Sequence, residues 1–296
     1  MKAGLVALVG RPNAGKSTLM NRLVGQKVAI VSDKPQTTRT RILGVRSGDG
    51  GQIVFIDTPG IHRPLHRLNV RMVDAAIVSL GQADVVCAVA DASEEVGAGD
   101  EYLAALLAKA SRPLVLALNK IDRVARPALL PLIERWSRLA RFDDIVPVSA
   151  LTGEQEADLL RALLGRLPEG EPLYPEDYLT DQPERAFVAE IVREKVLRHT
   201  RDELPFSSAV LIDRFEEAGK GGLMRLFCTI LVERESQKAI VVGRGGSMIK
   251  RIGTEARQEL ERFFGARVFL DLRVKARAGW REDPRLLDEI GLREGR

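Results

Sequence analysis

The sequence predicts an α/β domain with a doubly wound, mixed sheet, followed by a smaller α+β domain. A glycine-rich loop at residues 10–17 lies between an apolar run and a helix-like segment. Each later apolar run ends in polar residues. This pattern is typical of strands whose carboxyl ends form a binding site. A Gly-x-x-Gly loop at 243–246 separates two helix-like segments in the second half of the chain. The length of 296 residues is also that of about two domains.

The first element is a strand, loop and helix with the pattern of a phosphate-binding site. Residues 5–9 predict a buried strand, and residues 17–23 predict a helix. Gly10 and Gly15 allow the loop to curl so that successive N–H groups point at phosphate oxygens. Lys16 supplies charge for the β- and γ-phosphates. The residues expected to contact a nucleotide here are Gly10, Arg11, Pro12, Asn13, Ala14, Gly15, Lys16, Ser17 and Thr18.

Further apolar runs complete the first domain, which we expect to span residues 1–168. The runs lie at residues 5–9, 41–47, 52–57, 84–91, 113–118 and 145–148. The second and third flank a Gly-Asp-Gly-Gly segment, which is typical of a hairpin, so one strand is expected to be antiparallel. Helix-like segments separate the others, which predicts parallel strands.

The third run ends in Asp57, Thr58, Pro59 and Gly60. A carboxylate at the end of a strand can hold the water shell of Mg²⁺, and the N–H of Gly60 can meet a γ-phosphate. The hydroxyl of Ser17 is a second candidate ligand of Mg²⁺. All four residues of this segment are therefore expected to lie against the nucleotide.

Two later runs end in residues that suit guanine. A carboxylate only accepts hydrogen bonds, so Asp122 suits the two donors of the guanine edge, which adenine lacks. After the sixth run, a backbone N–H could reach guanine O6. The residues expected to read the base are Asn119, Lys120, Asp122, Ser149, Ala150 and Leu151. The order of these motifs indicates GTP.

Together with Gln36-Thr37-Thr38-Arg39, these segments match five guanine-nucleotide motifs, and the chain resembles the Era-type family of bacterial GTPases over nearly its whole length. The resemblance implies GTP hydrolysis with Mg²⁺ and a threonine that closes over the metal and the γ-phosphate. We favour Thr38, although one sequence does not separate it from Thr37; the alternative is a polar surface turn. The expected catalytic residues are Lys16, Thr38, Asp57, Gly60 and Asn13, and the expected metal ligands are Ser17, Thr38 and Asp57.

One position departs from better-known GTPases. Ras-like enzymes place a water-orienting glutamine where this chain has Ile61, so unassisted hydrolysis is expected to be slow. Asn13 resembles the loop asparagine that holds K⁺ beside the phosphates in several potassium-activated GTPases. The alternative is that Asn13 only shapes the turn, because asparagine tolerates positive φ. K⁺ is therefore a hypothesis for a further cofactor.

Composition indicates a cytosolic protein and a linker between two domains. Cys87 and Cys228 lie in apolar runs and are expected to be buried thiols of a reducing compartment. No stretch approaches the roughly 18 apolar residues of a membrane span, and no signal peptide is visible. Residues 169–186 are rich in proline and acids, which is typical of a linker.

The second domain resembles a type II KH domain, with expected bounds 187–279 and a C-terminal tail at 280–296. Its pattern is a helix to about 203, strands at 208–216 and 223–235, the glycine loop, a helix to about 264, and a strand at 267–275. Loops of this kind bring their backbone against the phosphates of about four single-stranded nucleotides. The residues expected to bind RNA are Gly243, Arg244, Gly245, Gly246, Lys250 and Arg251.

Charge placement favours RNA as the ligand of this domain. Residues 225–281 hold 13 basic and 6 acidic residues. The alternative is a solvated helix face in which Glu255 pairs with Arg251 and Glu259 pairs with Arg262.

The resemblance implies that the RNA is the 3′ end of 16S ribosomal RNA and that the role is assembly of the small (30S) subunit. It also implies that the protein is a monomer and that it associates with the inner face of the membrane. We expect GTP to order residues 31–41 and 57–69, and the linker to transmit this to the RNA-binding domain. The alternatives are a membrane-associated signalling switch linked to cell cycle or stress, and an RNA-binding factor that uses GTP only as a stabilising ligand.

Overall fold

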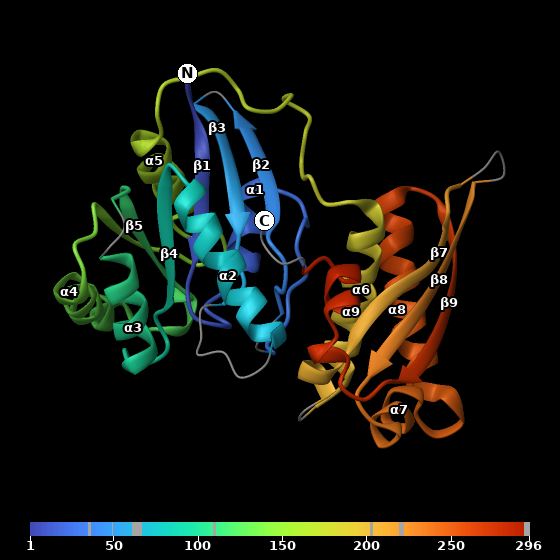
Figure 1. The fold of residues 1–296 in the computed structure, drawn as a ribbon. Helices are drawn as coiled ribbons and strands as arrows, with labels where there is room; N and C mark the ends of the chain where they lie inside the picture. The colour runs from blue at the N-terminus through green and yellow to red at the C-terminus, as the bar shows by residue number, and fades with distance from the viewer. Residues whose placement is uncertain are drawn as a thin grey trace. The chain divides into compact units, whose positions relative to one another are not determined.

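The computed structural model describes residues 1–34, 37–48, 50–60, 67–108, 111–201, 204–218 and 222–292 (Figure 1). The chain divides into two compact units, one made mainly of residues 1–181 and the other mainly of residues from 182 onward. Each unit has its own sheet and its own core. The finer domain boundaries expected from the sequence stay predictions.

A six-stranded sheet forms the first unit. Its strands are β1 (Lys2–Val9), β2 (Ile42–Gly48), β3 (Gly51–Asp57), β4 (Val85–Asp91), β5 (Leu114–Asn119) and β6 (Asp144–Pro147). The spatial order is β2-β3-β1-β4-β5-β6, and β2 alone runs antiparallel to its neighbour. The doubly wound mixed sheet and its antiparallel hairpin strand are therefore confirmed. The carboxyl ends of the parallel strands share one edge of this sheet, which is where the polar motifs lie.

Helices cover both faces of this sheet. They are α1 (Lys16–Val24), α2 (Arg67–Gln82), α3 (Ala98–Leu107), α4 (Leu129–Leu139) and α5 (Glu156–Arg166). Alternation along β1 sends Val6 and Leu8 into a core with α1 and α5, while Ala7 and Val9 face α2, α3 and α4. The parallel strands β1, β3, β4 and β5 are thereby buried on both sides, whereas β6, at the edge, is only partly buried.

The segment predicted as a linker lies on the first sheet as far as residue 181. Tyr174 and Tyr178 stack at 4.6 Å and pack against Leu43 and Val45 of β2 and Val54 of β3. We call residues 169–181 the strap. The strap covers β2 and β3 much as a helix covers the neighbouring strands.

Gln52 of β3 anchors the strap through both ends of its amide. Its Oε1 accepts from the N–H groups of Leu173 and Tyr174 at 2.7 and 2.9 Å, and its Nε2 donates to Tyr174 O at 2.8 Å. Further along, the N–H of Val45 donates to Leu179 O at 2.8 Å. The buried amide of Gln52 is therefore fully bonded, as a buried polar group needs to be.

The second unit packs helices against one face of a three-stranded sheet. Its elements are α6 (Glu184–His199), β7 (Ala209–Glu216), β8 (Leu223–Val232), α7 (Glu235–Val242), α8 (Ser247–Phe264), β9 (Arg267–Ala276) and α9 (Pro284–Glu289). The sheet order is β7-β8-β9, with β7 antiparallel and β9 parallel to β8. The sequence α6-β7-β8-α7-α8-β9 is the predicted type II KH order.

Two details of this unit differ from the sequence-based expectation. The strand expected to reach residue 235 ends at Val232, because Oε1 of Gln237 accepts from the N–H groups of Glu233 and Arg234 and begins α7 there. The expected tail is folded at its start, since Trp280 is buried and its indole N–H donates to Ser207 O at 3.0 Å. Residues 293–296 lie outside the described residues. Among the described helices, none has both the length and the apolar content that a membrane span requires.

Candidate functional site

The loop between β1 and α1 has a backbone that only certain residues tolerate. Gly10 lies so close to β4 that a Cβ there would sit 2.3 Å from Val89 O. Gly15 has φ +95° and Asn13 has φ +64°, both in the left-handed region. The φ of Asn13 fits the turn-shaping role that the sequence left open beside the K⁺ role. The conformation of this loop therefore depends on glycine at positions 10 and 15 and on asparagine at position 13.

Lys16 begins α1 with its ammonium group buried inside this loop. Its Nζ donates to Gly10 O at 3.1 Å and to Arg11 O at 3.0 Å. Burial lowers the pKa of Lys16 to about 8, against the opposing attraction of Asp57. A bound polyphosphate would supply the negative charge that favours the protonated form.

Three oxygen-bearing side chains from distant segments meet beside Lys16. Ser17 Oγ donates to Asp57 Oδ2 at 2.6 Å and lies 2.8 Å from Thr38 Oγ1, while Thr38 Oγ1 donates to Asp57 Oδ2 at 3.1 Å. Thr38, rather than its neighbour Thr37, supplies the hydroxyl of this cluster. The predicted metal ligands are thus brought together.

The donor set of this cluster suits Mg²⁺. Asp57 is fully buried, and its Oδ1 has no hydrogen-bond partner in the described part of the chain. Burial raises the pKa of Asp57, although Lys16 and hydrogen bonds from Ser17 and Thr38 act to lower it. A hard divalent cation would satisfy this oxygen and favour the ionised carboxylate.

The segment after Asp57 lies directly against the phosphate loop. A Cβ on Gly60 would come within 2.8 Å of Pro12 N, so glycine is required at this approach. Thr58 turns away from the loop, because its buried hydroxyl donates to Leu8 O at 2.8 Å. Two residues named from the sequence, Gln36 and Ile61, lie outside the described residues.

The base-reading motifs are held together by hydrogen bonds between loops. Asn119 donates through Nδ2 to Ala14 O at 2.9 Å and accepts through Oδ1 from the N–H of Ala150 at 2.9 Å. Ser149 Oγ donates to Asp122 Oδ1 at 2.6 Å. Asn119 therefore joins the phosphate loop to the loop after β6, while Asp122 is oriented by the serine of that second loop.

Three supporting side chains were not identified from the sequence. Asp91, at the end of β4, forms an ion pair with Lys120. Burial acts to raise the pKa of Asp91, but hydrogen bonds from Lys120 and Ser93 lower it below its ordinary value. Arg22 of α1 donates to Ala150 O at 3.2 Å and to Leu151 O at 2.6 Å. These bonds hold the loop after β6 against α1.

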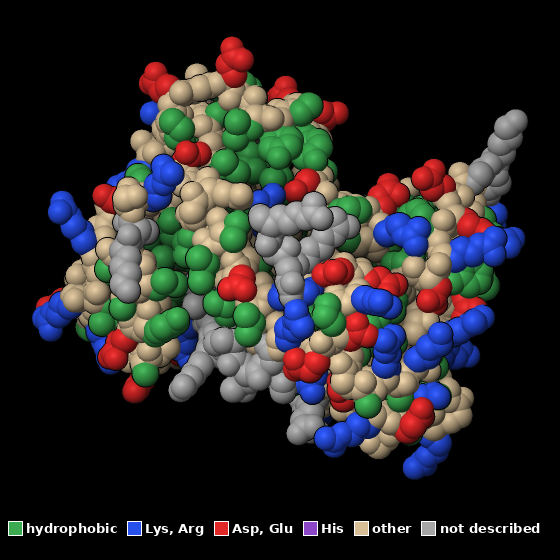
Figure 2. Space-filling view, viewed as in Figure 1, with side chains coloured by type: hydrophobic (Ala, Val, Ile, Leu, Met, Phe, Trp, Pro, Cys, Tyr) green, Lys and Arg blue, Asp and Glu red, His purple; other side chains and the backbone are tan. Residues whose placement is uncertain are grey.

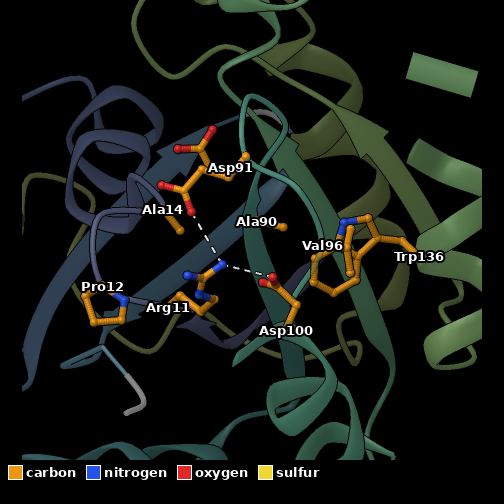
Figure 3. Close-up of a pocket in the computed structure, with 9 residues that line it drawn as sticks. Arg11, Pro12, Ala14, Ala90, Asp91, Val96, Asp100 and Trp136 are labelled. Carbon is orange, nitrogen blue, oxygen red and sulfur yellow. Dashed lines mark hydrogen bonds and ion pairs between the residues drawn. The ribbon is translucent and has the colours of Figure 1, made fainter. Parts of the chain in front are cut away.

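The third supporting residue is Asp100, at the start of α3. Arg11 of the phosphate loop points toward it, and the Nη1–Oδ2 distance is 2.9 Å (Figure 3). The same carboxylate oxygen accepts from the N–H of Gly97 at 3.0 Å, and Glu94 lies 3.4 Å from the guanidinium. These partners are about 80 to 90 residues away from Arg11 in the chain, so no local sequence pattern predicts them.

The glycine loop of the second unit connects α7 to α8. Gly243, Gly245 and Gly246 have φ of +74°, +60° and +77°. A Cβ on Gly243 would lie 2.7 Å from Met248 N, whereas Gly245 and Gly246 face open space. The loop therefore exposes its backbone at the N-terminus of an 18-residue helix, where anions are favoured.

The cations predicted beside this loop do not form the ion pairs within α8 that the alternative requires. Glu255 instead accepts from His199 at 2.8 Å, and Glu259 forms an ion pair with Lys195 of α6. The pairing of these acids with Arg251 and Arg262, expected for a merely solvated helix face, is wrong. Lys250 and Arg251 are exposed and form no ion pair with a described residue.

Comparisons with known proteins match both units. Residues 5–120 match the family described as 50S ribosome-binding GTPase, and residues 203–281 match the KH domain family. GTPase Era of Heliobacterium modesticaldum is 45% identical over 99% of this chain and 98% of its own length. GTPase Era of Geotalea daltonii is 48% identical over 98% and 97%.

Two solved structures are similar over the whole chain. One is a variant of Aquifex aeolicus Era bound to GDP.AlF4-, and the other is Era in complex with MgGDPNP and nucleotides 1506–1542 of 16S ribosomal RNA. Each is 42% identical, has a TM-score of 0.95 and covers 99% of this chain and 100% of its own. The chain therefore belongs to the GTPase Era family, as an enzyme that hydrolyses GTP and carries a KH domain.

Proposed function

We propose that this GTPase uses Mg²⁺, binds single-stranded RNA near the 3′ end of 16S ribosomal RNA through its KH domain, and acts in assembly of the 30S subunit. The observation that carries the proposal is the full-length similarity to an Era structure that holds both MgGDPNP and a 16S fragment. The phosphate loop with its buried Lys16 and the exposed glycine loop supply independent physical support.

The proposed chemistry rests on preorganised charge. Lys16 and the N–H groups of the loop stabilise the charge that develops on the β- and γ-phosphates. Gly60, pressed against Pro12, brings a backbone N–H to the γ-phosphate side. Ser17, Thr38 and Asp57 would hold Mg²⁺, which neutralises phosphate charge when bound. Asp122 accepts hydrogen bonds from guanine while Ser149 fixes its orientation.

We propose K⁺ as a further activator held through Asn13. Asn13 is exposed in the phosphate loop and has φ +64°, and it resembles the loop asparagine of potassium-activated GTPases. GTP turnover should be several-fold faster in KCl than in NaCl, and Asn13→Asp should remove most of the difference. Equal rates of the native protein in both salts would reject the cation role.

RNA binding is assigned to the glycine loop because its backbone is accessible to phosphates. Gly243→Asp would be a poor test, since a Cβ there collides with Met248. Gly245→Asp places a carboxylate in open space instead, and aspartate tolerates positive φ. Gly265 is a matched control, because it has φ +61° and open space at the other end of α8.

The experiment compares GTP and RNA binding across three variants. Gly245→Asp should weaken binding of a 16S 3′-end oligoribonucleotide at least about tenfold by repelling phosphate, with GTP turnover retained. Asp122→Asn should weaken GTP binding by about ten- to a hundredfold and leave RNA affinity unchanged. Gly265→Asp should resemble the native protein. Equal loss of RNA affinity in both glycine variants would overturn the assignment of the loop.

A further inference from the structure

The sheet of the second unit has a face that is open toward the Leu223 end of β8 and that the proposed function does not use; further along the same face, Thr229 and Leu231 are buried. We call this open part the open face. Along β8, Leu226 and Cys228 are buried against the helices. Because side chains alternate along a strand, Arg225 and Phe227 lie on the opposite face. In the register of β8 with β9, Arg225 is opposite Phe269, so Phe269 shares that face.

A cation and two aromatic rings form a row across the three strands. The ring centroids of Phe227 and Phe269 are 5.9 Å apart, and the guanidinium carbon of Arg214 on β7 lies 5.7 Å from the centroid of Phe227. Phe269 is 48% exposed. We call Arg214, Phe227 and Phe269 the aromatic row.

The charges on this face are mainly positive. Figure 2 shows Lys and Arg side chains, interspersed with acids, over the region where Figure 1 labels the strands of the second unit. By strand register the face carries five cations and three carboxylates: Arg214, Arg225, Arg267, Arg273 and Lys275 against Asp213, Glu216 and Asp271. Arg225 and Lys275 are exposed and form no ion pair with any residue that the structure describes.

Packing of the fold alone does not account for the aromatic row. The core of this unit lies on the other face, where Val268 is 4% exposed beside the half-exposed Phe269. The two rings contact each other and Arg214 lies over Phe227, yet much of Phe269 still faces water. Exposed aromatic rings among cations are the elements that stack bases and attract phosphates.

We propose that the open face is a second single-stranded RNA site, separate from the glycine loop. Two unpaired bases stack on Phe227 and Phe269, which lie on adjacent strands, while Arg225 and neighbouring cations meet the phosphates. Every base presents a π-face, so this site is tolerant of sequence. Its contribution to affinity is independent of the backbone contacts at Gly243 to Gly246.

The test uses an unstructured oligoribonucleotide that carries the fluorescent base 2-aminopurine, together with the same oligomer made abasic at several positions. Phe227→Ala and Phe269→Ala combined should lower affinity for the normal oligomer about tenfold and reduce the fluorescence quenching that stacking causes. The abasic oligomer should bind the native and doubly substituted proteins equally. Phe→Leu at both positions keeps apolar contacts and should show the same loss.

Phe263→Ala is the matched control, because Phe263 is 47% exposed but lies on α8 and stacks on Phe187. This variant should bind as the native protein does. Repeating the series with Gly245→Asp present separates the two sites, since residual binding should then depend on the aromatic row. The proposal is overturned if both double variants bind the normal oligomer as tightly as the native protein, or if Phe263→Ala weakens binding as much. An unchanged affinity of Gly245→Asp alone would instead reject the glycine loop.

Discussion

Burial and charge act against each other at Lys16. Its ammonium group donates to two loop carbonyls and is otherwise enclosed, so its pKa falls to about 8. The phosphates of a nucleotide raise that pKa again. The bound state therefore holds more protons than the free state above about pH 8, and nucleotide affinity must fall as pH rises through this range.

We predict that affinity for GTP falls about tenfold between pH 7 and pH 9 because the free protein loses the proton of Lys16. Fluorescence titration with a labelled nucleotide at each pH measures this. Lys16→Ala should bind far more weakly with a nearly flat profile, which corrects for ionisation of the nucleotide itself. A native profile parallel to that of Lys16→Ala would refute the role of this proton.

At the scale of elements, the strap replaces a helix on the edge of the first sheet. Gln52 converts a proline-rich segment into an ordered one by bonding two consecutive residues of it. The amide is buried on β3, whereas the segment it holds lies more than 120 residues away.

Gln52→Ala should lower the free energy of opening the strap by about 2 kcal/mol. The population of the open strap then rises about thirtyfold. Chymotrypsin should then cut faster after Tyr178, which packs against β2 and β3 in the native protein, whereas the bond after Tyr174 resists the protease because Pro175 follows it. Gln82→Ala removes only an exposed hydrogen bond from Arg41 and serves as the control. An unchanged cleavage rate for Gln52→Ala would mean that the tyrosine pair alone holds the strap.

Sequence reasoning succeeded where chemistry follows local pattern. Gly10 and Asp57 lie at strand ends and Lys16 begins a helix, each with a recognisable neighbour, so the sheet edge and the phosphate loop were predictable. Partners far apart in the chain were not predictable from the sequence. The pairing of Arg11 with Asp100 and the bonds of Gln52 join segments far apart in the chain. Glu255 turns toward α6 for the same reason, because tertiary contact outcompetes its helix neighbour Arg251.

At the scale of the whole molecule, two units of different chemistry share one chain. The first unit presents a loop with a buried lysine to a triphosphate, and the second presents exposed backbone and cations to a polyanion. We propose that GTP orders the segments around Thr38 and Gly60 and that RNA affinity responds to this ordering. A typical coupling of about 1–3 kcal/mol corresponds to a five- to 150-fold change in affinity.

The most direct test is the affinity for a 16S 3′-end oligoribonucleotide, measured by fluorescence anisotropy with saturating GDP and with a non-hydrolysable GTP analogue. We predict at least fivefold tighter binding with the triphosphate, and no nucleotide dependence in Lys16→Ala. The same RNA affinity of the native protein with both nucleotides would contradict the account, because the two units would then act independently.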